Sequence, residues 1–128
     1  MSTMQLEHIN LTVSDPQRTA RLLEKLFDWH VRWEGAAMDE GYTVHIGSDE
    51  RYLALYSPQD SPQSSETSHT ALGLNHIGVV VNDLDDIERR VKAAGFKTFN
   101  HAEYEPGRRF YFQDSDRLEF EVISYSTP

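Results

Sequence analysis

The chain has 128 residues and a formal net charge of −9 at pH 7, because 21 Asp and Glu residues outnumber 12 Lys and Arg residues. This length fits one domain, or two small modules that share a core. The absence of cysteine excludes disulfides, thiolate metal ligands and cysteine nucleophiles. Without a dense Lys/Arg cluster, so acidic a chain is not expected to bind nucleic acid, since phosphate binding needs basic surface.

Two features of the sequence bear on membranes and targeting. No apolar run approaches the length of a membrane span, and the mean hydropathy is −0.60. The first residues lack a basic patch followed by an apolar stretch, so we expect no signal peptide. We therefore expect a cytoplasmic protein that does not bind membranes.

The first predicted element is a strand whose pattern recurs later in the chain. Residues 6–13 read LEHINLTV, and residues 74–81 read LNHIGVVV. Leucine, histidine, isoleucine, valine and a following aspartate recur at a constant offset of 68 positions, as in His8 and His76. An internal repeat of this kind predicts two similar modules.

Each strand is followed by a predicted helix. Asp15 and Pro16 are typical of a helix start, and apolar residues at helical spacing follow up to Phe27. In the second half, Asn82 or Asp83 caps a similar stretch that ends at Gly95. Three strand-like segments then complete each half: 30–33, 42–46 and 52–56 in the first, and 96–99, 109–113 and 118–125 in the second.

The segment between the repeats is rich in Ser, Pro and Gln and has almost nothing to bury. We expect a single domain, 1–128, that consists of module 1 (4–57), a linker (58–72) and module 2 (73–128). A linker this long lets the modules pair within one chain or exchange between two chains. Because exchange is a low-cost route to dimers, we expect a homodimer.

Period-two alternation separates the side chains of each strand into two faces. The apolar side chains of the first strands should face the helices, so His8 and His76 point to the opposite side of a curved sheet. In the last strand, Glu121 points away from the core in the same way. A single histidine is more often a hydrogen-bonded sheet residue than a ligand. Its recurrence at one register, together with a carboxylate, favours a divalent metal site.

In these strands, helices and polar residues the chain resembles the vicinal oxygen chelate superfamily, which includes glyoxalase I, bleomycin-resistance proteins, fosfomycin-resistance enzymes and type I extradiol dioxygenases. The resemblance covers essentially the whole chain. It implies an α+β fold in which two βαβββ modules form a cup-shaped mixed sheet, with the helices on the outer face. It also implies metal ligands from the first and last strands, on His8, His76 and Glu121. Glyoxalase I has a further ligand at the position of Ala54, where alanine offers no donor atom.

Two histidines and one glutamate resemble the facial triad of the extradiol dioxygenases, which leaves positions open for substrate and oxygen. The stretch before Glu121 is also similar to a signature of these enzymes, although Ser115 and Arg117 replace its proline and glycine. This resemblance would make Tyr111 a hydrogen-bonding partner of the substrate oxygen, and His101 a proton-transfer group. The alternatives are a tyrosine at the rim of the sheet and a solvated histidine in a loop.

The resemblance implies an enzyme with one divalent metal ion, acting on a small chelating substrate with neighbouring oxygens. Fe2+ is favoured, and Mn2+, Zn2+ or Ni2+ are alternatives. We expect dioxygenase chemistry first, and lyase or isomerase chemistry of the glyoxalase type second. A metal-free small-molecule binding protein of the bleomycin-resistance type and an inactive module remain alternatives.

Overall fold

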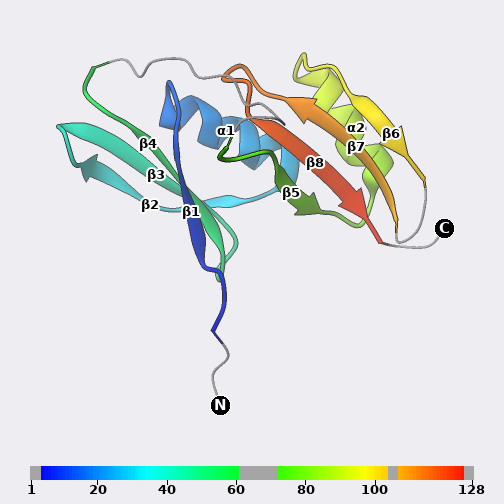
Figure 1. Cartoon of the computed structure of the whole chain (residues 1–128), viewed down its shortest axis with the longest axis horizontal. Coiled ribbons are helices and arrows are strands. Elements are labelled where there is room, and N and C mark those ends of the chain that lie inside the picture. The colour runs from blue at the N-terminus through cyan, green and yellow to red at the C-terminus, as the bar shows by residue number, and fades with distance from the viewer. Residues whose placement is uncertain (1–3, 61–71, 104–106, 126–128) are drawn as a thin grey trace. The chain divides into compact units, whose positions relative to one another are not determined.

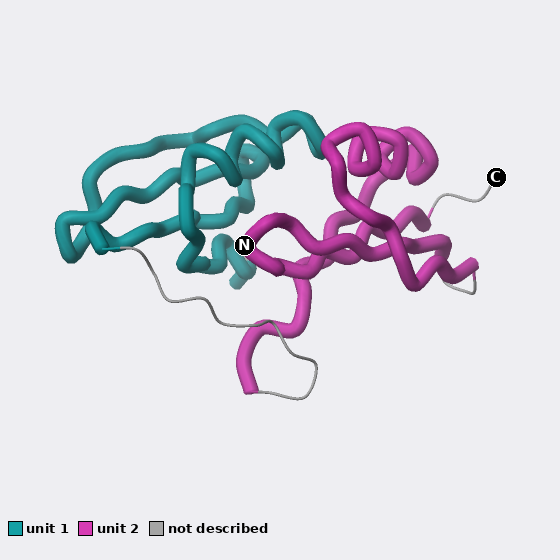
Figure 2. Tube along the Cα trace, turned by 90° about the horizontal axis from the view of Figure 1, so that it is seen from above, with its two compact units in different colours: residues 1–63 teal, residues 64–128 magenta. Residues whose placement is uncertain are grey.

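The structure, a computed structural model, describes residues 4–60, 72–103 and 107–125. It divides into two compact units, residues 1–63 and 64–128 (Figure 2). In each unit a strand and a helix are followed by three more strands (Figure 1). The predicted α+β fold of two βαβββ modules is therefore confirmed. Most of the predicted linker, 61–71, lies outside the described residues.

Unit 1 contains one mixed four-stranded sheet and one helix. Its elements are β1 (His8–Thr12), α1 (Pro16–Phe27), β2 (His30–Ala37), β3 (Gly41–Gly47) and β4 (Tyr52–Ser57). The strand order is β1-β4-β3-β2, with β1 parallel to β4 and the other pairs antiparallel. The first and last strands of the unit thus lie side by side (Figure 1).

Unit 2 has the same topology. Its elements are β5 (Ile77–Val80), α2 (Leu84–Ala93), β6 (Phe99–Ala102), β7 (Arg108–Gln113) and β8 (Glu119–Ser124). The strand order is β5-β8-β7-β6, and only the pair of β5 and β8 is parallel. The repeat seen in the sequence is therefore a repeat of structure.

The backbone register relates the two units residue by residue. Asn10 on β1 pairs with Ala54 on β4, and Gly78 on β5 pairs with Glu121 on β8. Because Asn10 and Gly78 are related by the repeat offset, Ala54 and Glu121 occupy equivalent positions. The strand pairing thus supports the alignment of Ala54 with Glu121, from which we expect that a fourth metal ligand is missing at Ala54.

Both helices begin where the sequence predicts. The side chain of Asp15 accepts a hydrogen bond from the amide of Arg18 at 3.1 Å, and that of Asp83 accepts from the amide of Asp86 at 3.0 Å. Gly95, just beyond α2, has a φ of +97°, a conformation that glycine adopts without strain. Among the described residues, no helix combines the length and the apolar character that a membrane crossing requires.

The core of each unit lies between its helix and one face of its sheet. Helix α1 packs on β3 and β4, and α2 packs on β7 and β8. In unit 2, Phe112 and Phe120 are fully buried and stack with ring centroids 5.0 Å apart. The side chains that alternate with these core residues form the opposite face of the sheet, here termed the far face.

Strand β6 differs from its predicted position, 96–99. It begins at Phe99, so His101 lies in a strand and not in the loop that the sequence favours. The pairing with β7 shifts register between Phe99 and Ala102, which marks a β-bulge. The first bulge residue, Asn100, has a φ of +53°. Because of the extra residue, His101 points to the face opposite the one that uninterrupted alternation from Phe99 would give.

The cap of α2 provides a test of the local stability. Replacing Asp83 with alanine removes the acceptor for the amide of Asp86, so we expect the free energy of unfolding to fall by about 1 kcal/mol. The Asp83→Asn variant keeps an acceptor and should retain most of the stability. Urea unfolding followed by circular dichroism measures both. Equal losses would show that the charge of Asp83, and not its hydrogen bond, stabilises the helix.

Candidate metal centre

A histidine, a glutamate and an arginine form a connected polar cluster on the far face of unit 2. Nε2 of His76, just before β5, lies 3.1 Å from Oε1 of Glu121 on β8. Nη1 of Arg109 on β7 donates to Oε2 of the same carboxylate at 2.9 Å. The Glu121 side chain is only 13% exposed. Both of its oxygens are therefore held in a largely buried position.

The contacts of His76 fit a cation at Nε2. Its Nδ1 lies 2.8 Å from Oδ1 of Asn75, so both ring nitrogens face an acceptor oxygen. A ring with its proton at Nδ1 leaves the Nε2 lone pair facing Glu121, and a proton or a cation between these two atoms would satisfy both of them. Two ligands at right angles, each about 2.1 Å from a divalent metal, lie about 3.0 Å apart. The 3.1 Å pair matches this spacing.

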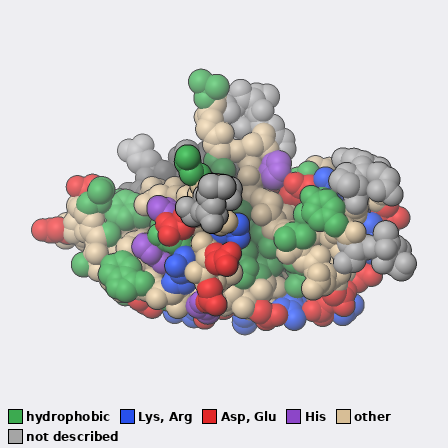
Figure 3. Space-filling model, turned by 90° about the horizontal axis from the view of Figure 1, so that it is seen from below, with side chains coloured by type: hydrophobic (Ala, Val, Ile, Leu, Met, Phe, Trp, Pro, Cys, Tyr) green, Lys and Arg blue, Asp and Glu red, His purple; other side chains and the backbone are tan. Residues whose placement is uncertain are grey.

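In unit 1 a row of rings crosses the far face of the sheet. Nδ1 of His8 lies 2.8 Å from Oε1 of Glu7, and the ring of His8 stacks on Tyr52 with centroids 4.8 Å apart. Tyr52 also stacks on His45 at 4.7 Å, and Trp33 meets His45 edge-on at 5.3 Å. Histidine side chains are visible at the surface beside acidic and basic ones (Figure 3). His8 is thus held by a hydrogen bond and by ring stacking.

His45 is a far-face residue that the sequence pattern did not single out. It pairs with Ala54, as Tyr111 pairs with Glu121, so His45 and Tyr111 are equivalent in the two units. Burial, and then the positive charges of neighbouring side chains, lower the pKa of His45. Ala54 is the equivalent of Glu121 in unit 1, and only the pairing between β3 and β4 shows that His45 lies beside it. The residue pattern of a single strand does not show which residues of the neighbouring strand it pairs with.

Tyr111 lies next to the cluster. Its ring meets the His76 ring edge-on, with centroids 5.6 Å apart. A cavity of about 370 Å³ opens beside them. Its lining residues are Asn75, His76, Asn100, Ala102, Arg109, Tyr111 and Glu119. The structure therefore brings Tyr111, His76 and Glu121 together on one face.

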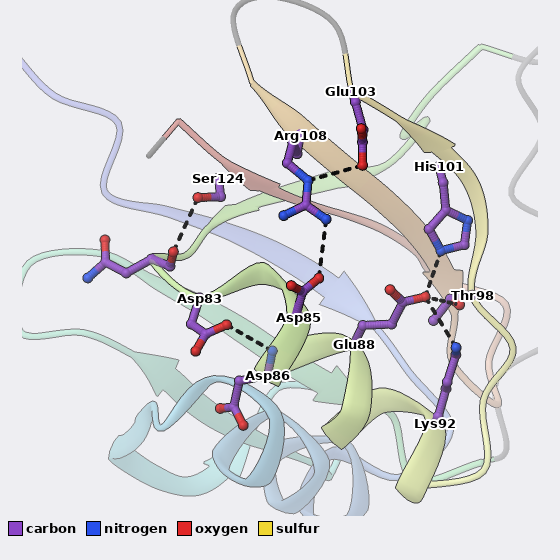
Figure 4. A network of polar contacts seen from close by, with 11 residues as sticks. Asp83, Asp85, Asp86, Glu88, Lys92, Thr98, His101, Glu103, Arg108 and Ser124 are labelled. Atoms are coloured by element: carbon purple, nitrogen blue, oxygen red, sulfur yellow. Dashed lines mark hydrogen bonds and ion pairs between the residues drawn. The ribbon is translucent and has the colours of Figure 1, made fainter. Parts of the chain in front are cut away.

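His101 lies on the helix side of the sheet, apart from this cluster. Its Nε2 lies 2.6 Å from Oε2 of Glu88 on α2, and Thr98 donates to the same oxygen at 2.5 Å (Figure 4). Its ring stacks on Phe110, which is fully buried. Burial alone would raise the pKa of Glu88, but the hydrogen bonds from Thr98 and His101 lower it. These contacts connect β6 to α2 and favour a structural role for His101, whose proton-transfer role stays a prediction.

The three predicted ligands belong to different units. His8 lies in unit 1, whereas His76 and Glu121 lie in unit 2. Within residues 4–60, 72–103 and 107–125, no group of three His, Asp or Glu side chains is gathered as a metal site. The grouping of His8 with the other two residues therefore stays a prediction.

A family model decides which superfamily the sequence and fold represent. The Glyoxalase/Bleomycin resistance protein/Dioxygenase superfamily model matches residues 5–122. The chain belongs to this superfamily. The resemblance expected from the sequence is thereby confirmed.

Solved structures of other proteins share the fold over almost the whole chain. The glyoxylase/bleomycin resistance protein/dioxygenase domain from Frankia sp. EAN1pec is 24% identical, with a TM-score of 0.81 over 96% of this chain and 98% of that chain. A mutant of the fosfomycin resistance protein FosX from Listeria monocytogenes, complexed with Mn(II) and 1S,2S-dihydroxypropylphosphonic acid, is 21% identical, with a TM-score of 0.76 over 98% and 95%. The glyoxalase family protein from Enterococcus faecalis is 20% identical, with a TM-score of 0.73 over 93% and 96%. No curated protein sequence matches the chain.

The environment of His45 leads to a prediction about its protonation. Burial is the main cause of its low pKa, and the charge of Arg32 adds to it, so Arg32→Gln should raise the pKa of His45 part of the way toward 6.5. NMR titration of the His45 ring protons in the parent protein and in the variant measures the change.

The same shift predicts how stability depends on pH. Because folded His45 takes up its proton at lower pH than the unfolded chain does, its contribution to stability should fall as the pH drops from about 6.5 through the lower pKa of the folded state. A pKa of His45 at or above 6.5 would contradict this account.

Proposed function

We propose that the protein is an enzyme that binds one divalent metal ion through His8, His76 and Glu121. Its substrate is a small molecule that chelates the metal through neighbouring oxygens. The observation that carries the proposal is the 3.1 Å approach of Nε2 of His76 to a carboxylate oxygen. The equivalent histidine of unit 1 supports it, and so does the Mn(II) in FosX, a protein of the same fold.

A bound metal would supply positive charge that polarises two neighbouring substrate oxygens. Fe2+ is the favoured ion, and Mn2+, Zn2+ or Ni2+ suit the same donors. Ala54 stands where a fourth protein ligand would be and has no donor atom. Three protein ligands leave positions for substrate, which supports dioxygenase chemistry first and lyase or isomerase chemistry second.

The residues around the cluster have separate tasks in this proposal. Arg109 fixes the orientation of the Glu121 carboxylate through the 2.9 Å hydrogen bond. The Tyr111 hydroxyl bonds a substrate oxygen in the cavity beside His76. His45 accepts a proton on the far face of unit 1, because its lowered pKa keeps the ring neutral near pH 7. His101, bonded to α2, has no part in this chemistry.

Metal binding by ligand variants tests the proposal. Metal-stripped protein titrated with Mn2+ should bind one ion per chain, measured from the loss of the free-ion electron paramagnetic resonance signal. His76→Ala and Glu121→Ala should each weaken binding by at least about 100-fold, since losing a ligand costs more than losing one of its supporting partners. His101→Ala should bind like the parent protein.

Two results would overturn this assignment. Unchanged affinity in the Glu121→Ala variant would mean that the third ligand lies elsewhere. If neither Mn2+ nor Fe2+, the latter under anaerobic conditions, bound in stoichiometric amount, the proposed metal site would be refuted. The metal-free binding protein would then be the favoured alternative.

The linker also supports a homodimer, which we include in the proposal. Light scattering should then give a mass near twice 14.8 kDa. If modules exchange between chains, mixing His8→Ala with Glu121→Ala protein and reshuffling the subunits should restore one intact site in each heterodimer. If each site forms within one chain, the mixture should bind no more metal than its components do. The mass of a single chain across a wide concentration range would refute the dimer.

A further inference from the structure

In both units, the residue just before the first-strand histidine holds the Nδ1 atom of that histidine. Nδ1 of His8 lies 2.8 Å from Oε1 of Glu7, and Nδ1 of His76 lies 2.8 Å from Oδ1 of Asn75. Glu7 and Asn75 are themselves related by the repeat offset. Two different residue types thus make the same contact from the same position.

Two other histidines are bonded to a carboxylate through Nε2, as His76 itself also is to Glu121. Nε2 of His30 lies 3.2 Å from an aspartate oxygen, and Nε2 of His101 lies 2.6 Å from a glutamate oxygen. Among the described residues, Nε2 of His8 has no hydrogen bond. A ring that donates through Nδ1 keeps its Nε2 lone pair for a ligand. A contact at Nδ1 is thus what the two proposed metal ligands share, and the described contacts of His30 and His101 do not include one.

A ring contact adds a second restraint in each unit. His8 stacks on Tyr52 with an interplanar angle of 13°, and His76 meets Tyr111 at 80°. The hydrogen bond at Nδ1 and the ring contact together restrict rotation of the imidazole. The direction of Nε2 is thus set before any metal binds.

We propose that Glu7 and Asn75 are positioning residues: each keeps its histidine in the Nδ1–H tautomer and directs Nε2 toward the metal. The inference rests on the proposed function, because it assigns a task toward that metal. Neither residue contacts the substrate. Glu7 also brings a negative charge close to His8, whereas Asn75 does not, so loss of Glu7 should weaken metal binding more.

Metal affinity measures the effect of each residue. Glu7→Ala and Asn75→Ala should weaken Mn2+ binding by about 10- to 100-fold, the range typical of partners that orient metal ligands. Glu7→Gln and Asn75→Asp keep an acceptor oxygen and should recover most of the affinity. Glu50→Ala removes the same charge elsewhere in unit 1 and serves as the control. Parent-like affinity in both alanine variants would overturn the proposal.

The tautomer of His8 gives a readout that needs no metal. For the neutral rings, ¹⁵N NMR should show the Nδ1–H tautomer for His8 and the Nε2–H tautomer for His101. Glu7→Ala should shift His8 toward the Nε2–H form and leave His101 unchanged. An Nε2–H tautomer of His8 in the parent protein would overturn the proposal.

The ligand variants separate this inference from the proposed function. If His8→Ala and His76→Ala bind Mn2+ like the parent protein, the metal site itself is wrong, and the positioning role falls with it. If those variants lose metal while Glu7→Ala and Asn75→Ala keep it, the metal site stands and only the positioning role is refuted.

Discussion

The parallel pairing of the first strand of each module with its last strand is the constraint on which the candidate site depends. Paired residues of neighbouring strands point to the same face, so this pairing decides which side chain of the last strand accompanies the histidine. In unit 2, Glu121 is paired with Gly78, whose Cβ position has no heavy atom within 4 Å. No side chain therefore stands between His76 and the carboxylate. In unit 1 the larger side chain of the equivalent pair is on the first strand, where Asn10 on β1 is paired with Ala54 on β4.

The two far faces show two different arrangements of side chains on one scaffold. The face of unit 1 is a row of stacked rings, and the guanidinium of Arg32 lies 4.4 Å from the centre of the Tyr52 ring. In unit 2, Glu121 is instead held by the ion pair with Arg109 and by His76. The helix-side residues stabilise each unit independently of these groups. The far-face side chains are therefore able to differ while the fold is kept.

The sequence predicted the elements whose signals are local. The repeat, the caps at Asp15 and Asp83, and the face of Glu121 depend on residue type and spacing along one segment. The start of β6 and the face of His101 were missed, because a bulge interrupts period two without changing composition. His45 was missed for another reason: its position beside Ala54 is a property of two paired strands.

The bulge in β6 also bears on how the cavity can vary. β6 is the edge strand of its sheet, and Asn100 lines the cavity as the first residue of the bulge. The bulge absorbs the extra residue, so the partners before and after it keep their faces, and the contact of His101 with Glu88 remains. An insertion or deletion at this point adds or removes one polar group in the cavity wall and leaves the flanking register unchanged. Strand length is thus a route by which the lining of this cavity can change without substitution of any other residue.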